Sequence, residues 1–73
     1  MEAEQKVKKI LNSIRLRRLD RGFTQDFVGE QLGISQYAYH KIEIGKTKLS
    51  LLRFFELCVV FETTPQKLFD DFV

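Results

Sequence analysis

The chain has 73 residues, enough for one domain but too few for two hydrophobic cores of useful volume, so we expect residues 1–73 to form a single domain. Hydrophobic residues make up 44% and charged residues 30%, which excludes the composition of a disordered chain. The net charge of +2 is unevenly distributed: residues 1–21 carry seven basic and three acidic side chains, whereas residues 51–73 carry two and four. The basic end suits either an anionic partner or a solvated helix.

Cys58 is the only cysteine, so the chain has no internal disulfide. The sequence does not begin with the charged and apolar regions of a signal peptide. The longest nearly apolar run, residues 51–61, contains Arg53 and Glu56 and is much shorter than the roughly 20 residues of a membrane span. We therefore expect a cytoplasmic protein that does not bind membranes.

The first predicted helix extends to about Arg21 through residues of high helix propensity. Gly22 ends it, because glycine readily adopts the left-handed conformation that closes a helix. Apolar residues recur at the spacing of one helical face, at Val7, Ile10, Leu11 and Ile14. This face is expected to lie against the core.

Two short helices follow. Thr24 can cap a helix that runs to about residue 32, where Gly33 ends it. Ser35 can cap a third helix that runs to about residue 44 and stops at Gly45. A tight turn of three or four residues therefore separates the two helices.

The remaining residues predict a loop and two further helices. Residues 45–49 have no helical periodicity, and Ser50 can cap a fourth helix over about residues 51–61. Thr64 followed by Pro65 favours the start of a fifth helix, because the missing N–H of proline would have no partner in the first turn. No strand or repeat is indicated, so the sequence predicts an all-α domain of five helices.

The junction between the second and third helices has the composition of a helix-turn-helix. Gly29 would let the two backbones approach closely, and Gly33 would permit the tight turn. An apolar set then fills the junction, namely Val28, Leu32 and Ile34. Such packing is needed to hold a helix rigidly in a DNA groove.

Three segments, Thr24-Gln25, Gly33-Ile34-Ser35-Gln36 and Lys41-Ile42-Glu43-x-Gly45-Lys46, resemble the Cro/XRE family of helix-turn-helix regulators. The resemblance covers roughly residues 10–70 and implies a five-helix, lambda-repressor-like DNA-binding domain. It implies core positions at Arg18, Phe23, Leu51, Phe54, Leu57, Cys58, Phe61, Leu68 and Phe69. The implied function is sequence-specific binding of double-stranded DNA by a transcription regulator, most simply a repressor.

Four residues of the third helix correspond to the base-reading set of the family: Gln36, Tyr37, His40 and Lys41. Glutamine can pair bidentately with adenine in the major groove. Tyr37 suits a thymine methyl or a phosphate, and Lys41 a guanine or a phosphate. His40 has no ligand partners at metal spacing, so we expect neither a metal nor a cofactor.

The resemblance also implies phosphate contacts at Thr24, Gln25, Ser35, Lys46, Thr47 and Lys48. Gln25 lies in the first turn of the second helix, where free N–H groups and the helix dipole attract a phosphate. The loop lysines would neutralise the sugar-phosphate backbone. The alternatives are a surface glutamine and two solvated lysines.

Three positions depart from the family pattern. Arg17 replaces an aliphatic core residue, so either its stem packs inward or the helix is rotated to bury Leu16 and Leu19. Tyr39 also replaces an aliphatic residue, and we expect a buried ring. Ile44 stands where a polar residue is usual.

The fourth helix is apolar on two sides. Beside its core face, a second stripe contains Leu52, Phe55 and Val59. We expect this stripe, with Phe72 and Val73, to form a two-fold dimer contact, so that the operator is an inverted repeat with recognition helices about 34 Å apart. The alternative is burial beneath the first helix or the C-terminal segment.

Nothing in the sequence indicates an enzyme, because catalytic groupings and a glycine-rich phosphate loop are lacking. Cys58 falls at a core position and suggests a buried, inert thiol. The competing hypothesis is a protein-interaction module of the same fold, such as an antitoxin or a regulator-binding protein. A single electropositive face would favour DNA binding.

Overall fold

The computed structural model describes residues 2–70, which form five α-helices and no strand over that range. The helices are α1 (Glu2–Asp20), α2 (Gln25–Leu32), α3 (Gln36–Glu43), α4 (Leu51–Val60) and α5 (Pro65–Asp70). The all-α, five-helix architecture is therefore confirmed. Within the described range, no helix has the length and apolar character needed to span a membrane.

Local capping explains where four of the helices begin. In α2, α3, α4 and α5, a hydroxyl accepts a hydrogen bond from the backbone N–H three residues later, at 3.0, 3.0, 3.0 and 3.2 Å respectively. The capping residues are Thr24, Ser35, Ser50 and Thr64. Each satisfies an N–H group that has no partner inside its own helix.

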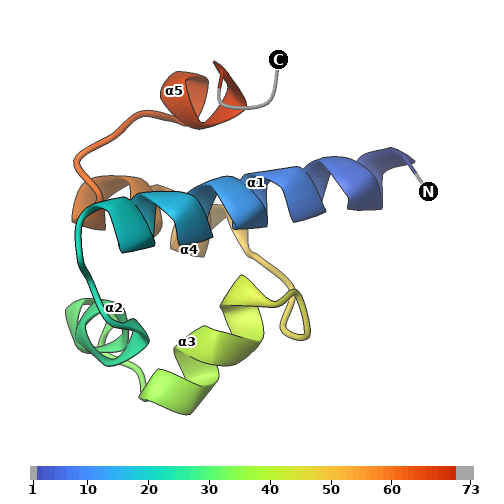
Figure 1. Cartoon of the computed structure of the whole chain (residues 1–73). Helices are drawn as coiled ribbons and strands as arrows, with labels where there is room; N and C mark the ends of the chain where they lie inside the picture. The colour runs from blue at the N-terminus through green and yellow to red at the C-terminus, as the bar shows by residue number, and fades with distance from the viewer. Residues whose placement is uncertain (1, 71–73) are drawn as a thin grey trace.

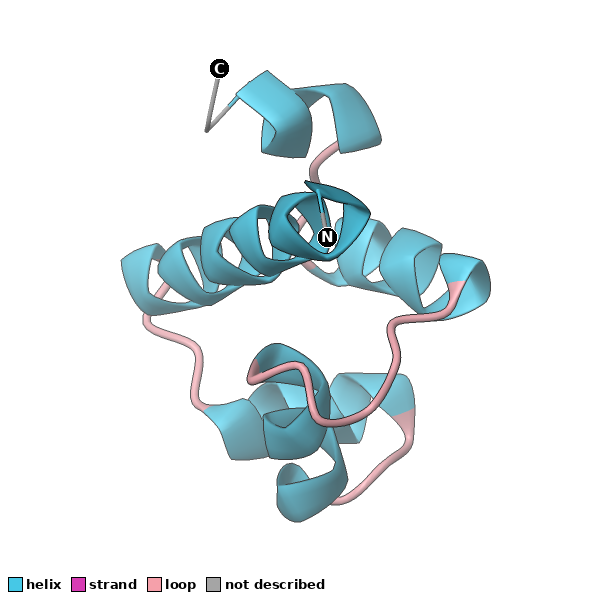
Figure 2. Ribbon diagram, turned by 90° about the vertical axis from the view of Figure 1, so that its right-hand side faces the viewer, coloured by secondary structure: helices cyan, strands magenta, loops and turns pink. Residues whose placement is uncertain are grey.

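The helices lie in three layers. α1 and α4 cross in the middle of the molecule, with α5 on one side of them and the α2–α3 pair on the other (Figures 1 and 2). The contact between α2 and α3 is the most extensive of any helix pair. α2 and α3 thus form a unit that faces away from α5.

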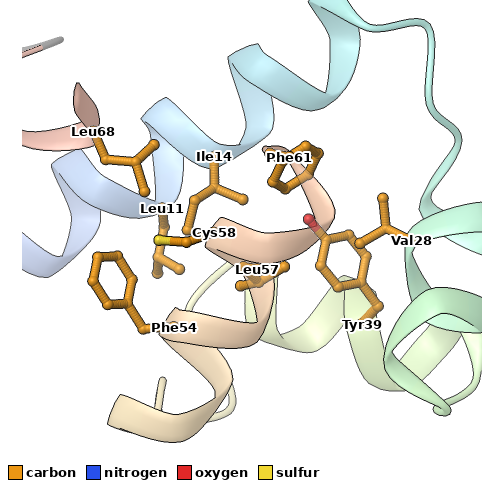
Figure 3. Close-up of a cluster of buried hydrophobic side chains, with 9 residues drawn as sticks. All are labelled: Leu11, Ile14, Val28, Tyr39, Phe54, Leu57, Cys58, Phe61 and Leu68. Atoms are coloured by element: carbon orange, nitrogen blue, oxygen red, sulfur yellow. The ribbon is translucent and has the colours of Figure 1, made fainter. Parts of the chain in front are cut away.

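The core contains side chains from all five helices. Its buried members are Leu11, Ile14, Val28, Tyr39, Phe54, Leu57, Cys58, Phe61 and Leu68. Figure 3 shows Leu11, Phe54 and Leu68 at one end of this cluster, and Val28 and Tyr39 at the other. The predicted burial of the Tyr39 ring is confirmed.

Gly29 permits the close approach of α2 to the chain that follows it. A Cβ at this position would lie 3.0 Å from the carbonyl oxygen of Ile34 and 3.1 Å from that of Ser35. Both are backbone atoms that cannot move without shifting the start of α3. The turn itself depends on Gly33, whose φ of +74° is in the left-handed region.

The structure decides between the two alternatives for α1. Arg17 is half-buried, and its guanidinium donates to the carbonyl of Lys67 in α5 at 3.4 Å. Leu16 and Leu19 are about half exposed. The helix is therefore not rotated to bury the two leucines.

Three positions expected in the core are exposed instead. Leu51 is 71% exposed, because it lies one helical turn before the exposed Phe55 and shares its side of α4. Phe69 stacks on Phe54 with ring centroids 6.3 Å apart, but its outer side is open to solvent. Val7 is also exposed, in the first turns of α1, where residues 2–9 are all exposed.

Candidate nucleic-acid interface

A hollow of about 540 Å³ lies where the start of α2 meets the start of α3. It is lined by five polar or aromatic residues: Gln25, Ser35, Gln36, Tyr37 and His40. α3 buries Tyr39, Ile42 and Glu43, which turns the lining residues of this helix outward. The structure therefore brings together three of the expected base-reading residues and two of the expected phosphate-contacting ones.

Two helix N-termini meet at this hollow. Gln25 is the first residue of α2, and Ser35 caps α3. The free N–H groups and the positive dipole end of each helix favour an anion there. The Thr24 and Ser35 hydroxyl oxygens accept the capping hydrogen bonds, so each hydroxyl still has its proton to donate to a further acceptor.

A buried ion pair between Arg18 and Glu43 lies behind the hollow. The guanidinium donates to both carboxylate oxygens, from Nε at 2.9 Å and from Nη2 at 3.0 Å, and also to the carbonyl of Phe23 at 2.9 Å. The Glu43 side chain is 2% exposed. This bidentate geometry fixes the C-terminal turn of α3 to α1.

Gln25 is connected to the ion pair. Its amide Nε2 donates to Oε1 of Glu43 at 3.3 Å, which uses one of its two amide hydrogens. Burial alone would raise the pKa of Glu43, but the neighbouring groups that favour the carboxylate outweigh it, above all the hydrogen bonds and positive charge of Arg18, and the pKa lies below its usual value. The side chain expected to contact phosphate is thus oriented by a carboxylate that stays ionised.

The Tyr39 hydroxyl lies beside Arg18 and Glu43 but has no partner in hydrogen-bond geometry. Burial raises the pKa of Tyr39, and the nearby Glu43 carboxylate raises it further. The hydroxyl therefore remains protonated in the folded protein.

The loop after α3 is tied to the end of that helix. The backbone N–H groups of Lys46 and Thr47 both donate to the carbonyl of Lys41, at 2.9 and 3.1 Å. Gly45 makes this turn possible with a φ of +83°. The exposed Lys46 and Thr47 consequently keep a fixed position relative to α3.

The two remaining lysines of the candidate set lie in different surroundings. The Lys41 ammonium is over the Tyr37 ring, 5.1 Å from its centroid. Lys48 lines a separate groove of about 450 Å³ between the loop and α1, together with Glu4 and Lys8. Lys48 is therefore not part of the hollow.

The apolar stripe of α4 is exposed in the described structure. Leu52 and Val59 are 71% and 77% exposed, and Phe55 is 48% exposed. Leu51 belongs to the same stripe. Over residues 2–70, no other helix buries these side chains, so burial beneath α1 is excluded. Phe72 and Val73 lie outside the described residues.

The ion pair itself was missed by the sequence reasoning. Arg18 was expected only as a core position, and Glu43 only as part of a motif. The sequence did contain a signal for it. Glu43 lies four residues after Tyr39, on the inward side of the third helix, and Arg18 lies four residues after Ile14, on the inward side of the first. A charged residue on each of two inward faces indicates a buried pair.

Among the described residues, no group of three His, Cys, Asp or Glu side chains could hold a metal ion. Cys58 is 5% exposed, and burial raises the pKa of its thiol. A protonated, buried thiol is a poor nucleophile. The predicted burial of Cys58 is thus confirmed.

The sequence profile of the helix-turn-helix family matches residues 14–68, which is 55 of the 73 residues. The chain belongs to the Cro/XRE-type helix-turn-helix family. This family has the lambda-repressor-like fold, consists of DNA-binding regulators and is typically not enzymatic. No curated protein and no solved structure matches the chain.

Proposed function

We propose that this chain regulates transcription in the cytoplasm by binding a specific sequence of double-stranded DNA, with α3 in the major groove. The observation that carries this proposal is the polar hollow at the joined N-termini of α2 and α3. Gln36 is exposed in the first turn of α3, whose start packs closely on Gly29 and whose C-terminal turn is tied to α1 by the Arg18–Glu43 pair. Such preorganisation lets a glutamine discriminate bases by about 1–3 kcal/mol.

In this proposal, Gln36, Tyr37, His40 and Lys41 face base edges or the nearest phosphates. Thr24, Gln25 and Ser35 bind one DNA strand through hydroxyls, an amide and helix N-termini. Lys46, Thr47 and Lys48 bind the backbone on the other side of the groove. The hydrogen bonds that attach the loop to the end of α3 support these assignments, because they hold the phosphate-contacting loop at a fixed position relative to the base-reading side chains.

The decisive experiment is selection of bound duplexes from a random pool at physiological salt, with Gln36→Ala in parallel. The wild type is expected to enrich one short motif. Gln36→Ala is expected to relax the preference at one base pair. Failure of the wild type to enrich any sequence would overturn the proposal.

Phosphate contacts have a separate test. Lys46→Ala is expected to weaken binding to every sequence and to reduce the slope of log K against log salt by about one unit. Lys67→Ala, at another exposed lysine on α5, is the matched control and should leave the slope unchanged. A changed base preference with an unchanged slope in Lys46→Ala would contradict the assignment.

We further propose a homodimer that binds an inverted repeat through the exposed stripe of α4, with Phe72 and Val73. Large apolar side chains exposed side by side are typical of an interface. Sedimentation at high micromolar concentration is expected to give a dimer without DNA. Repression would then follow from occupancy, since a bound dimer excludes polymerase.

The same stripe supports the alternative function, a module whose α4 binds a different protein. The repressor and the interaction module differ in how the purified protein associates and whether it selects DNA. A monomer that enriches no DNA sequence would favour the interaction module. A dimer that enriches an inverted repeat would favour the repressor.

A further inference from the structure

Tyr37 and Lys41 are in contact on the outer side of α3. They are four residues apart, and Lys41 Nζ lies 5.1 Å from the centroid of the Tyr37 ring. At this distance the negative face of the ring attracts the ammonium group. Tyr37 is 69% exposed, so the contact forms at the protein surface and contributes little to folding.

The contact determines where the lysine charge lies. Side chains on a helix point toward its N-terminus, so pairing with a residue four positions earlier draws the ammonium group toward the first turn of α3. That turn carries Gln36, which lines the hollow with Tyr37. Without this ring, the Lys41 ammonium group would be free to move through the range that its flexible four-carbon stem allows.

We propose that Tyr37 is a positioning residue, whose ring holds the Lys41 ammonium over the outer side of α3 and thereby restricts the base or phosphate that Lys41 contacts. This inference rests on the proposed DNA-binding function of α3. Tyr37 still faces the DNA in this arrangement, but its effect on recognition comes from the ring that positions Lys41 and not from its hydroxyl. A surface contact of this kind corresponds to roughly a two- to fivefold change in affinity.

A double-mutant cycle tests the coupling, measured as affinity for the selected DNA sequence. Tyr37→Leu is expected to weaken binding two- to fivefold, by the same surface cation–π estimate, and to relax the base preference at the position that Lys41→Met relaxes. Adding Tyr37→Leu to Lys41→Met should cause no further loss. Tyr37→Phe keeps the ring and should stay within about twofold of the wild type.

Three outcomes would overturn the inference. Equal losses from Tyr37→Leu in the two backgrounds would show an independent role for Tyr37. A loss in Tyr37→Phe as large as in Tyr37→Leu would assign the effect to the hydroxyl. An unchanged affinity in Lys41→Met would remove the lysine from recognition. Lys67→Met serves as the matched control, because this exposed lysine of α5 should show no coupling to Tyr37.

Proton NMR of the free protein separates this inference from the proposed function. The Lys41 ε-methylene protons should show an upfield ring-current shift that disappears in Tyr37→Leu but persists in Tyr37→Phe. Absence of the shift in the wild type would overturn the inference even if DNA binds. A shift without selection of any DNA sequence would instead show that the proposed function has failed, and the positioning role with it.

Discussion

Two sides of the molecule differ in what they bury: the α2–α3 side buries a charged group, whereas the outer side of α4 exposes apolar side chains. Beneath α3, a carboxylate is buried and neutralised by Arg18, while the residues that line the hollow are polar or aromatic. On α4, Leu52, Phe55 and Val59 face solvent. Both arrangements are unfavourable without a partner. The first has its partner within the chain, so folding accounts for it, whereas the second points to assembly.

The largest expected effect is the removal of the buried carboxylate. Glu43→Ala should lower the free energy of unfolding by about 3–5 kcal/mol, because the Arg18 guanidinium is left buried without a counter-charge. Urea unfolding measures it. The double variant Arg18→Met with Glu43→Leu should cost much less, since it removes both charges. An equal cost in the two variants would show that packing, not charge, stabilises this side.

The same pair should make stability depend on acid. The folded pKa of Glu43 lies below its ordinary value of 4.5, so the pair contributes fully above that pH and less as the pH falls through the folded pKa. Thermal melts between neutral and acidic pH should show this loss. The Arg18→Met, Glu43→Leu variant is expected to lose less stability over the same range. An equal loss of thermal stability in the wild type and the double variant would contradict the role of the ion pair in acid sensitivity.

Crowding at Gly29 should have an intermediate effect. Gly29→Ala places a methyl group about 3 Å from two backbone carbonyls, and the repacking should cost about 1–3 kcal/mol. The start of α3 must shift, so affinity for DNA should fall more than stability alone explains. Measurement of both quantities in one variant tests this. A stabilised protein with unchanged affinity for DNA would mean that the contact between α2 and the start of α3 accommodates the extra methyl group without cost.

The smallest effect on folding is expected on α4. Val59→Glu should change the unfolding free energy of the monomer by at most about 0.5 kcal/mol, because this side chain is exposed. It should nevertheless abolish the dimer in sedimentation. Leu16→Glu, at a half-exposed leucine of α1, is the matched control and should leave association intact. Dissociation by both variants would indicate a nonspecific effect of charge.

Local features of the fold could be predicted from the sequence. Thr24, Ser35, Ser50 and Thr64 each cap a helix through a hydrogen bond to the residue three positions later, so the signal lies within four residues. Gly33 likewise ends α2 through its own backbone conformation. Boundaries set by neighbours in the chain are therefore predicted well.

Features set by the relative rotation of helices were not predictable in the same way. Leu51 was expected in the core because the family resemblance implied it, but the rotation of α4 in this chain leaves it 71% exposed. Arg18 and Glu43 are 25 positions apart, so their pairing depends on how α1 crosses α3. The outward position of the candidate site residues on α3 could be predicted from the helical spacing. The hydrogen bond from Gln25 to Glu43 could not, because it joins residues 18 positions apart on two different helices.

The buried Tyr39 hydroxyl gives the molecule an optical reporter of unfolding. The chain has two tyrosines and no tryptophan, and only Tyr39 is in the core. Because burial raises its pKa above the ordinary value of 10.0, folding is favoured by the protonated form and loses stability as the solution becomes more alkaline. Half of the tyrosinate absorbance should therefore appear only when the core opens, as a cooperative step in an alkaline titration.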